Sequence, residues 1–126
     1  MTTAYVDTSA LVAIATNEPS GPAVGERLAA FDRVISGTIL EAELRSVFVR
    51  QGRAWVPGVI SRIHWVLPRR PLGPELAAAL DAGYLRPGDL LHLATALYAT
   101  EEMDRVTFVT LDRRQAEVAA ALGFQT

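Results

Sequence analysis

The chain has 126 residues, half of them hydrophobic and 21% charged, which is typical of one globular domain with a core of its own. Its formal net charge of −2 excludes a protein that binds nucleic acid by general attraction to phosphates, so any such contact would be local or bridged by metal ions. All 12 basic residues are arginine and there is no cysteine, which excludes disulfides, zinc–thiolate sites and every chemistry that uses a lysine.

The first half of the chain shows strands and helices in alternation. Each predicted strand is a short apolar run, and each predicted helix has apolar residues three and four positions apart. Ser9 is a suitable N-cap for the first helix, and Thr38 is suitable for the third. In chain order we predict a strand over 3–6, helices over 10–16 and 23–31, a strand over 33–36, and a helix over 39–51 that Gly52 ends.

The second half continues this alternation after a segment rich in proline and tryptophan. Pro87 and Gly88 mark the start of the clearest helix in the chain, and Gly123 is suited to end the last one. In chain order we predict a short helix early in 56–68, a strand over 65–67, helices over 74–83 and 87–100, a strand over 106–110 and a helix over 113–122. The pattern indicates one α/β domain over residues 1–126, built on a parallel sheet.

No apolar run reaches the roughly 18 residues of a membrane span. The first residues also lack the basic and apolar regions of a signal peptide. We therefore expect a cytoplasmic protein without membrane contact.

Two carboxylates directly follow predicted strands. Asp7 follows the first strand and Asp112 follows the last, and ligands of open α/β sheets bind beyond the carboxyl ends of the strands. Both acids also have a simpler interpretation. Asp112 with Gln115 fits a capping box, and Asp7 fits a turn, although Thr8 and Ser9 are available to cap in its place.

Two further acids lie on predicted helices. Asp89 opens its helix, where an acid also favours the helix dipole. Glu43 lies at the edge of an apolar helical face with no basic residue four positions away, whereas Glu41 has Arg45. A half-buried carboxylate without a partner invites a compensating cation. His92, three residues after Asp89, could orient that carboxylate, act as a base, or simply pack in the core.

Clustered carboxylates raise one another's pKa unless a cation neutralises them. Oxygen ligands without histidine–cysteine spacing suit Mg²⁺ or Mn²⁺ rather than zinc. Such a cluster supports phosphoryl chemistry, because a divalent ion lowers the pKa of water and clamps phosphate oxygens. The rival interpretation is a phospho-acceptor or phosphatase domain that uses Asp7, but those families use a lysine and this chain has none.

In four stretches the chain resembles the PIN domain family and, within it, the VapC-type toxins of toxin–antitoxin pairs: YVDTSALVA, LEAELRSVFVR, LRPGDLLHLATAL and FVTLDRRQAEVAAALGF. The resemblance implies a three-layer α/β/α sandwich with a short, mostly parallel central sheet. It implies a ribonuclease that hydrolyses RNA phosphodiester bonds with Mg²⁺, for which Mn²⁺ substitutes. It also implies a homodimer and a tight complex with a partner antitoxin. A PIN-like interaction module that does not cut RNA is the other alternative.

By position, the family's four acids match Asp7, Glu43, Asp89 and Asp112. Among these, the resemblance points most strongly to Asp7 and Asp89 as metal ligands. Thr110 matches a small hydroxyl residue before the fourth acid, and we expect Thr8 or Ser9 to support Asp7. Four arginines are candidates for steering the RNA backbone, although a solvated helix face explains each of them equally well: Arg45, Arg50, Arg113 and Arg114.

Overall fold

The structure, a computed structural model, describes residues 1–101 and 105–126. Within these residues the chain forms four strands, six α-helices and one 3₁₀ turn. In chain order they are β1 (Thr3–Val6), α1 (Thr8–Ala15), α2 (Gly21–Ala29), β2 (Arg33–Gly37), α3 (Ile39–Arg50), the 3₁₀ turn η1 (Pro57–Ile60), β3 (Ile63–Val66), α4 (Gly73–Ala82), α5 (Pro87–Thr100), β4 (Thr107–Val109) and α6 (Arg113–Ala121). None of the helices described is long and apolar enough to cross a bilayer.

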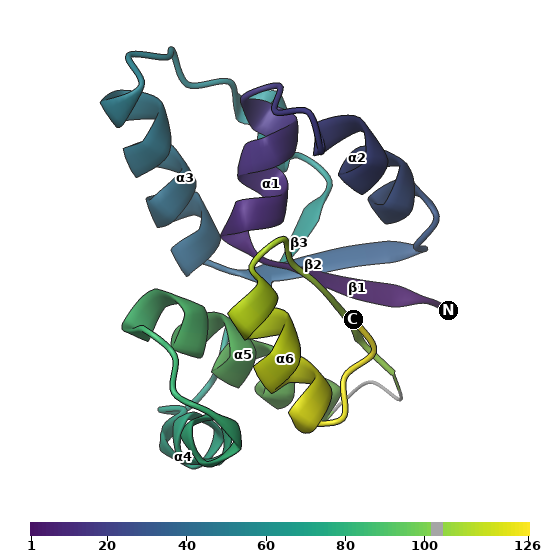
Figure 1. Cartoon of the computed structure of the whole chain (residues 1–126), viewed down its shortest axis with the longest axis vertical. Coiled ribbons are helices and arrows are strands. Elements are labelled where there is room, and N and C mark those ends of the chain that lie inside the picture. Colours follow the sequence, from purple (N-terminus) through teal and green to yellow (C-terminus); the bar gives the residue numbers. More distant parts are fainter. Residues whose placement is uncertain (102–104) are drawn as a thin grey trace.

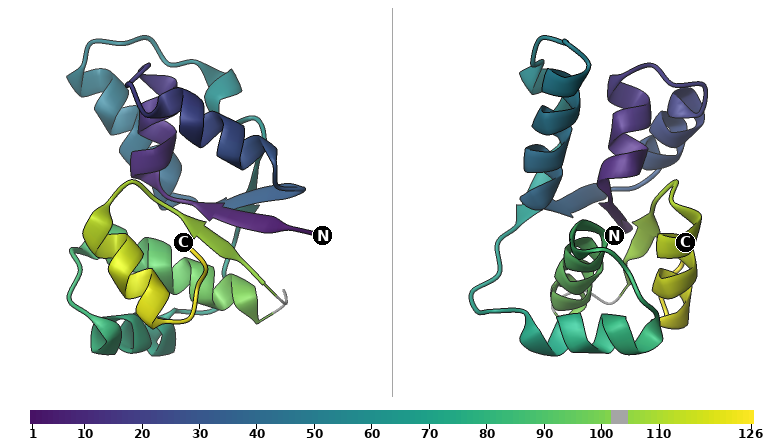
Figure 2. Two further views of the ribbon diagram at one scale, coloured as in Figure 1. Left: turned by 45° about the vertical axis from the view of Figure 1, so that its right-hand side comes forward. Right: turned by 60° about the vertical axis from the view of Figure 1, so that its left-hand side comes forward.

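The four strands form one sheet in the order β3-β2-β1-β4, and every pair of neighbours is parallel. Helices α1, α2 and α3 cover one face of this sheet, and α4, α5 and α6 cover the other (Figure 1 and Figure 2). This is the α/β/α sandwich that the resemblance implied, and the sheet is parallel as the alternation of strands and helices predicted. The described sheet is parallel throughout rather than mostly parallel.

Alternate residues of β1 enter two separate hydrophobic cores. Ala4 and Val6 belong to the core beneath α1, α2 and α3. Tyr5 belongs to the opposite core, where its ring stacks on Phe108 with centroids 5.3 Å apart. Because both faces of the sheet are buried, the strands are continuous apolar runs instead of alternating polar and apolar residues.

Several element boundaries differ from the sequence-based prediction. Helix α2 begins at Gly21, two residues early, because Pro22 lies in its first turn, where a missing N–H does no harm. Thr38 was expected to cap α3 through its side chain, but it makes no such bond and its backbone is helical, with φ −64°. Strand β3 begins at Ile63, two residues before the predicted segment.

Candidate active site

The carboxyl edge of the sheet brings the ends of β1 and β4 together. Val6 pairs with Val109, and the Asp7 N–H donates to the Val109 carbonyl at 3.1 Å. The chain leaves β1 toward β2 on one side, while β4 lies on the other side, so the strand order reverses here. In open α/β sheets such a switch point is the usual place for a ligand.

Asp7 is buried at this edge, with 2% of its surface exposed. Burial raises the pKa of its carboxyl, against the opposing effect of hydrogen bonds from the Ala10 N–H and the hydroxyls of Ser9 and Thr110. Ser9 Oγ lies 2.9 Å from Asp7 Oδ1, and Thr110 Oγ1 lies 2.9 Å from Asp7 Oδ2. The expected support of Asp7 by Ser9 is therefore present, and Thr110 contributes a second hydroxyl.

Asp7 is also the N-cap of α1, since its Oδ1 accepts the Ala10 N–H at 3.1 Å. The prediction that Ser9 caps this helix is wrong, and so is the argument that Asp7 is free of the capping role. The Ser9 hydroxyl is engaged elsewhere, because it donates to Asp7 and accepts the Leu111 N–H at 3.0 Å. Asp7 thus combines the capping role with its place in the acidic site.

Asp112 caps α6 as predicted, with the Gln115 N–H donating to its Oδ1 at 2.8 Å. The side chain of Gln115 does not close a capping box. It lies 2.8 Å from Thr110 Oγ1 through its oxygen, and its Nε2 donates to the Asp89 carbonyl at 3.2 Å. The Asp112 N–H in turn donates to Thr110 Oγ1 at 3.0 Å. Gln115 therefore links the C-terminal end of β4 to the first turns of α5 and α6, a role that the capping pattern does not suggest.

Asp89 lies in the first turn of α5 and is partly buried. Burial raises the pKa of its carboxyl, and the negative charges of Asp112, Asp7 and Glu43 raise it further. The charges of the other three acids therefore act on Asp89 at this edge of the sheet.

Glu43 has a basic partner that the spacing along its own helix does not reveal. His92 Nε2 lies 3.1 Å from Glu43 Oε1, across 49 residues of sequence, and Thr8 Oγ1 donates to the same oxygen at 2.7 Å. The hydrogen bond from His92 lowers the pKa of the Glu43 carboxyl, against a smaller opposing effect of burial. The prediction of an unpaired Glu43 is wrong, and Thr8 supports Glu43 instead of Asp7.

His92 is almost fully buried and contacts Glu43 through its Nε2. Its Nδ1 lies 2.8 Å from the Tyr5 hydroxyl, whose oxygen accepts the Gly37 N–H at 3.0 Å. The Glu43 carboxylate, which faces Nε2, can only accept a hydrogen bond, so Nε2 is the donor and Nδ1 accepts the Tyr5 proton. This assigns the proton of a neutral His92 to Nε2, facing Glu43 and Thr8. His92 is therefore a positioning residue for Glu43, and it does not orient Asp89.

Gly88 allows α5 to approach Glu43 closely. A side chain at this position would place its Cβ 2.8 Å from Glu43 Oε2. The carboxylate consequently lies beside the first turn of α5, where the helix dipole favours a negative charge.

A sequence model of the PIN domain matches residues 4–121. The chain belongs to the PIN domain family. PIN domains are in general nucleases, so this membership establishes the broad class of activity. The fold is similar to that in the crystal structure of PAE2754 from Pyrobaculum aerophilum, with 23% identity, a TM-score of 0.58, and coverage of 99% of this chain and 90% of that one. A search of curated proteins gave no significant match.

The acids of this PIN domain fit a divalent cation by their chemistry. They offer only carboxylate oxygens, and the pKa of Asp89 is raised by burial and by like charges, which a cation would neutralise. In residues 1–101 and 105–126, however, no three side chains of Asp, Glu, His or Cys are grouped so that they could hold an ion. Ligation of one ion by three of the acids would therefore require carboxylates to reorient.

Three of the four candidate RNA-steering arginines of the PIN domain are held by acidic side chains. Arg45 pairs with Glu41 at 2.7 Å, as the helical spacing predicted. Arg113 and Arg114 both pair with Glu117, at 3.3 and 3.7 Å. The fourth arginine, Arg50, lines a pocket that also contains Glu43.

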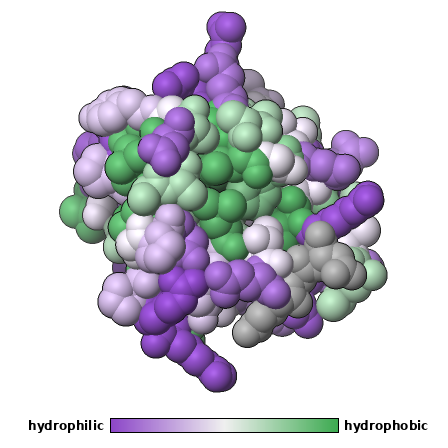
Figure 3. All heavy atoms as spheres, turned by 90° about the horizontal axis from the view of Figure 1, so that it is seen from below, coloured by the Kyte–Doolittle hydropathy of each residue, from purple (hydrophilic) through white to green (hydrophobic). Residues whose placement is uncertain are grey.

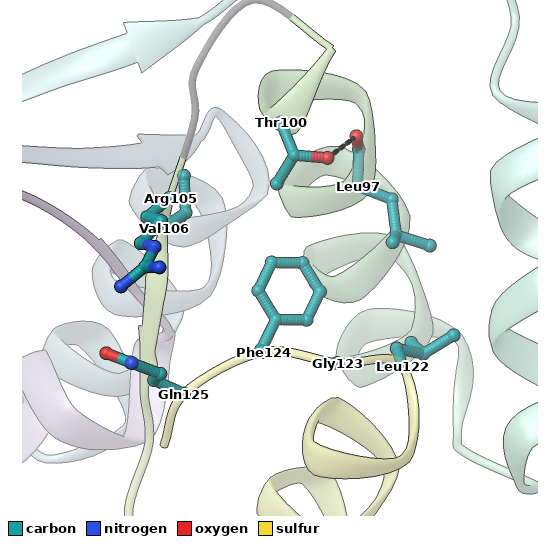
Figure 4. A pocket seen from close by; sticks show the side chains of 8 residues that line it. All are labelled: Leu97, Thr100, Arg105, Val106, Leu122, Gly123, Phe124 and Gln125. Carbon is teal, nitrogen blue, oxygen red and sulfur yellow. Dashed lines mark hydrogen bonds between the residues drawn. The ribbon is translucent and has the colours of Figure 1, made fainter.

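A separate pocket of about 440 Å³ lies away from the acids. It is enclosed by the end of α5, the start of β4 and the C-terminal segment, with the Phe124 ring between Leu97 and Val106 (Figure 4). Among the described residues, its lining includes none of the four candidate acids. This pocket therefore has no direct connection with the candidate nuclease site.

Proposed function

We propose that this PIN domain is a Mg²⁺-dependent endoribonuclease, with Mn²⁺ as a substitute, and that it is the toxin of a toxin–antitoxin pair in the cytoplasm. One observation carries the nuclease part of the proposal. At the carboxyl edge of the sheet, hydrogen bonds of Thr110 and Gln115 join the segments that carry Asp7, Asp112 and Asp89, and Glu43 lies against Gly88, next to Asp89. Family membership supports nuclease activity in general, and the preference for RNA, the metal and the toxin role rest on the resemblance described above.

The residues that would hold the cation are Asp7, Glu43, Asp89 and Asp112. When bound, the cation would lower the pKa of water and stabilise charge on the phosphate oxygens. The chain itself positions these acids. Ser9 and Thr110 bind Asp7, and Thr8 and His92 bind Glu43. Water forms the new bond to phosphorus and loses its proton to the acids or to solvent. The bond from phosphorus to O3′ breaks and O3′ takes up a proton from solvent, which leaves a 5′-phosphate and a 3′-hydroxyl.

Cleavage of total RNA tests this proposal. The purified chain is incubated with RNA in Mg²⁺, in Mn²⁺, and in EDTA, and fragments are separated on a denaturing gel. We expect discrete cleavage with either cation and none in EDTA. Intact RNA under every condition would contradict the proposal.

A PIN domain that binds without cutting is the second candidate, and one observation favours it. The described acids are not grouped as a ready metal site. Titration with Mn²⁺ to millimolar concentration, followed by thermal unfolding, separates the two candidates. A rise in Tm supports the metal enzyme, and an unchanged Tm together with uncut RNA supports the binding module. No observation favours the phospho-acceptor, because Asp7 is buried and both of its oxygens accept hydrogen bonds.

We also propose an antitoxin protein and a second copy of the chain as partners. Viewed from the side of α4, hydrophobic atoms gather near the centre of the molecular face, with hydrophilic atoms around them (Figure 3). Exposed hydrophobic side chains in this part of the chain include Leu80 and Tyr84. Extended apolar surface commonly marks interaction sites. Light scattering after size exclusion tests the dimer, and growth arrest on expression, relieved by the product of a neighbouring gene, tests the toxin role.

A further inference from the structure

A pocket of about 410 Å³ opens beside Glu43, one of the four candidate acids, on the outer side of α3. Its volume lies in the range of small-molecule sites. Thr8 contributes from the start of α1, and Figure 2 shows α1 and α3 side by side on the same face of the sheet. The α3 groove, as we call it, is lined by Thr8, Ile39, Ala42, Glu43, Ser46, Val47 and Arg50.

The α3 groove follows one stripe of the helix. Glu43, Ser46 or Val47, and Arg50 recur at intervals of three or four residues and so lie above one another on the helix surface. Glu43 and Arg50 are separated by two helical turns, about 10.5 Å along the axis. The groove therefore begins at an acid of the candidate active site and ends at a guanidinium group.

Arg50 differs from the other arginine of α3 in its surroundings. Arg45 is bound to Glu41, and its guanidinium carbon lies 4.1 Å from the centre of the Trp55 ring. Among the ion pairs within residues 1–101 and 105–126, none includes Arg50. Its guanidinium is thus available to a phosphate, to which it can donate two parallel hydrogen bonds.

We propose that the α3 groove binds the RNA strand next to the cleavage point, with Arg50 on a backbone phosphate. This inference rests on the proposed function and extends it to a specific surface. The apolar side chains of Ile39 and Val47 offer contact to the flat face of a base or ribose. The hydroxyl of Ser46 is exposed and bonded only within the helix, to the Ala42 carbonyl at 2.9 Å. The groove suits an anionic RNA strand because its positive charge, on Arg50, lies at the end remote from Glu43 and the other acids.

Binding of a fluorescein-labelled pool of random 12-nucleotide RNA, measured by polarisation, tests the proposal. The Asp89→Asn variant is used throughout so that the RNA stays intact. We expect Arg50→Ala to weaken binding about tenfold and to lower the slope of log affinity against log salt by about 0.7, the value for one phosphate contact on a single strand. Arg27→Ala is the matched control, because Arg27 is exposed on α2 and outside the groove. We expect it to change affinity less than twofold.

A second variant tests the groove without changing any charge. The chain has no cysteine, so Ser46→Cys can be labelled at a single position with a bulky maleimide. We expect the label to abolish RNA binding, whereas the same label on Ser20→Cys, which is exposed at the start of α2, leaves binding intact. Thermal unfolding confirms that each variant is folded.

The outcomes separate this inference from the proposed function. If neither Arg50→Ala nor the label on Ser46→Cys changes RNA affinity, the inference is wrong, even if the wild-type chain cuts RNA. The groove would then be a candidate binding site for a protein segment. Dependence on both supports the groove as a nucleic-acid site, even if the wild-type chain cuts nothing and the nuclease proposal fails.

Discussion

Replacing Asp7 by asparagine removes one charge from the candidate site while it keeps the shape of the side chain. The N-cap of α1 is retained, because asparagine caps a helix about as well as aspartate does. The second carboxylate oxygen becomes an amide donor and meets Thr110 Oγ1, which can accept it and turn its own proton to Gln115 Oε1, 2.8 Å away. The hydrogen-bond network of Asp7 can therefore rearrange without an unpaired buried group.

The expected effects on activity and stability are opposite in direction. An acid that holds a catalytic cation contributes about 4 kcal/mol to the transition state, so cleavage should fall about a thousandfold. The melting temperature should stay equal or rise, because burial disfavours the charged form of Asp7. The sign follows from its raised pKa. The stability advantage of Asp7→Asn over the wild type should be absent below pH 3.8, the ordinary pKa of an aspartate. It should appear as the pH rises above this value and be complete above the pKa of Asp7 in the folded protein.

Asp7→Ala is the matched control. It removes the acceptor for the Ala10 N–H, which should lower the free energy of unfolding by about 1 kcal/mol and the melting temperature by about 4 °C. Cleavage of RNA and thermal unfolding are measured for both variants in parallel. Full cleavage by Asp7→Asn would refute the assignment of Asp7 to the metal, and an equal loss of stability in both variants would refute the account of the buried charge.

Two further predictions concern pairs of residues. His92→Leu should lower cleavage more than tenfold and the free energy of unfolding by about 2 kcal/mol, since it deprives Glu43 and the Tyr5 hydroxyl of a buried partner. His92→Gln keeps a donor near the Nε2 position and should recover part of the activity; equal activity of both variants would show that packing alone is involved. Glu75 pairs with Arg70 at 2.6 Å, which lowers its pKa to about 2. The stability advantage of the wild type over Glu75→Gln in urea unfolding should therefore be present above the ordinary pKa of 4.5 and be lost as the pH falls toward 2, whereas an advantage independent of pH would contradict the ion pair.

The architecture and the position of two acids at the sheet edge could be predicted because their signals are local. The short apolar strands stand out since both faces of the sheet are buried, and a residue that follows a parallel strand must lie at the carboxyl edge. Asp7 and Asp112 were found in this way. The helical spacing of Glu41 and Arg45 likewise predicted a pair that the structure contains.

The remaining features depend on contacts between distant segments. The bond between Glu43 and His92 joins α3 to α5, so the periodicity of neither helix reveals it. The capping of α1 by Asp7 was missed because Ser9 is equally suitable in isolation, and only the position of the Leu111 N–H shows where its hydroxyl is engaged. The sequence predicts Gln115 as half of a capping box, since nothing nearby in sequence indicates Thr110 and the Asp89 carbonyl as its partners.

The most direct test of the metal-dependent nuclease is cleavage of 5′-labelled RNA by the wild type and Asp89→Asn, side by side in Mn²⁺ and in EDTA. Asp89 is the appropriate position because burial and the charges of the other three acids raise its pKa, and because its side chain does not cap its helix. We predict cleavage by the wild type in Mn²⁺ that leaves 5′-phosphate and 3′-hydroxyl ends, at least a hundredfold less by Asp89→Asn, and none in EDTA. Equal cleavage by the two proteins, or cleavage that persists in EDTA, would contradict it.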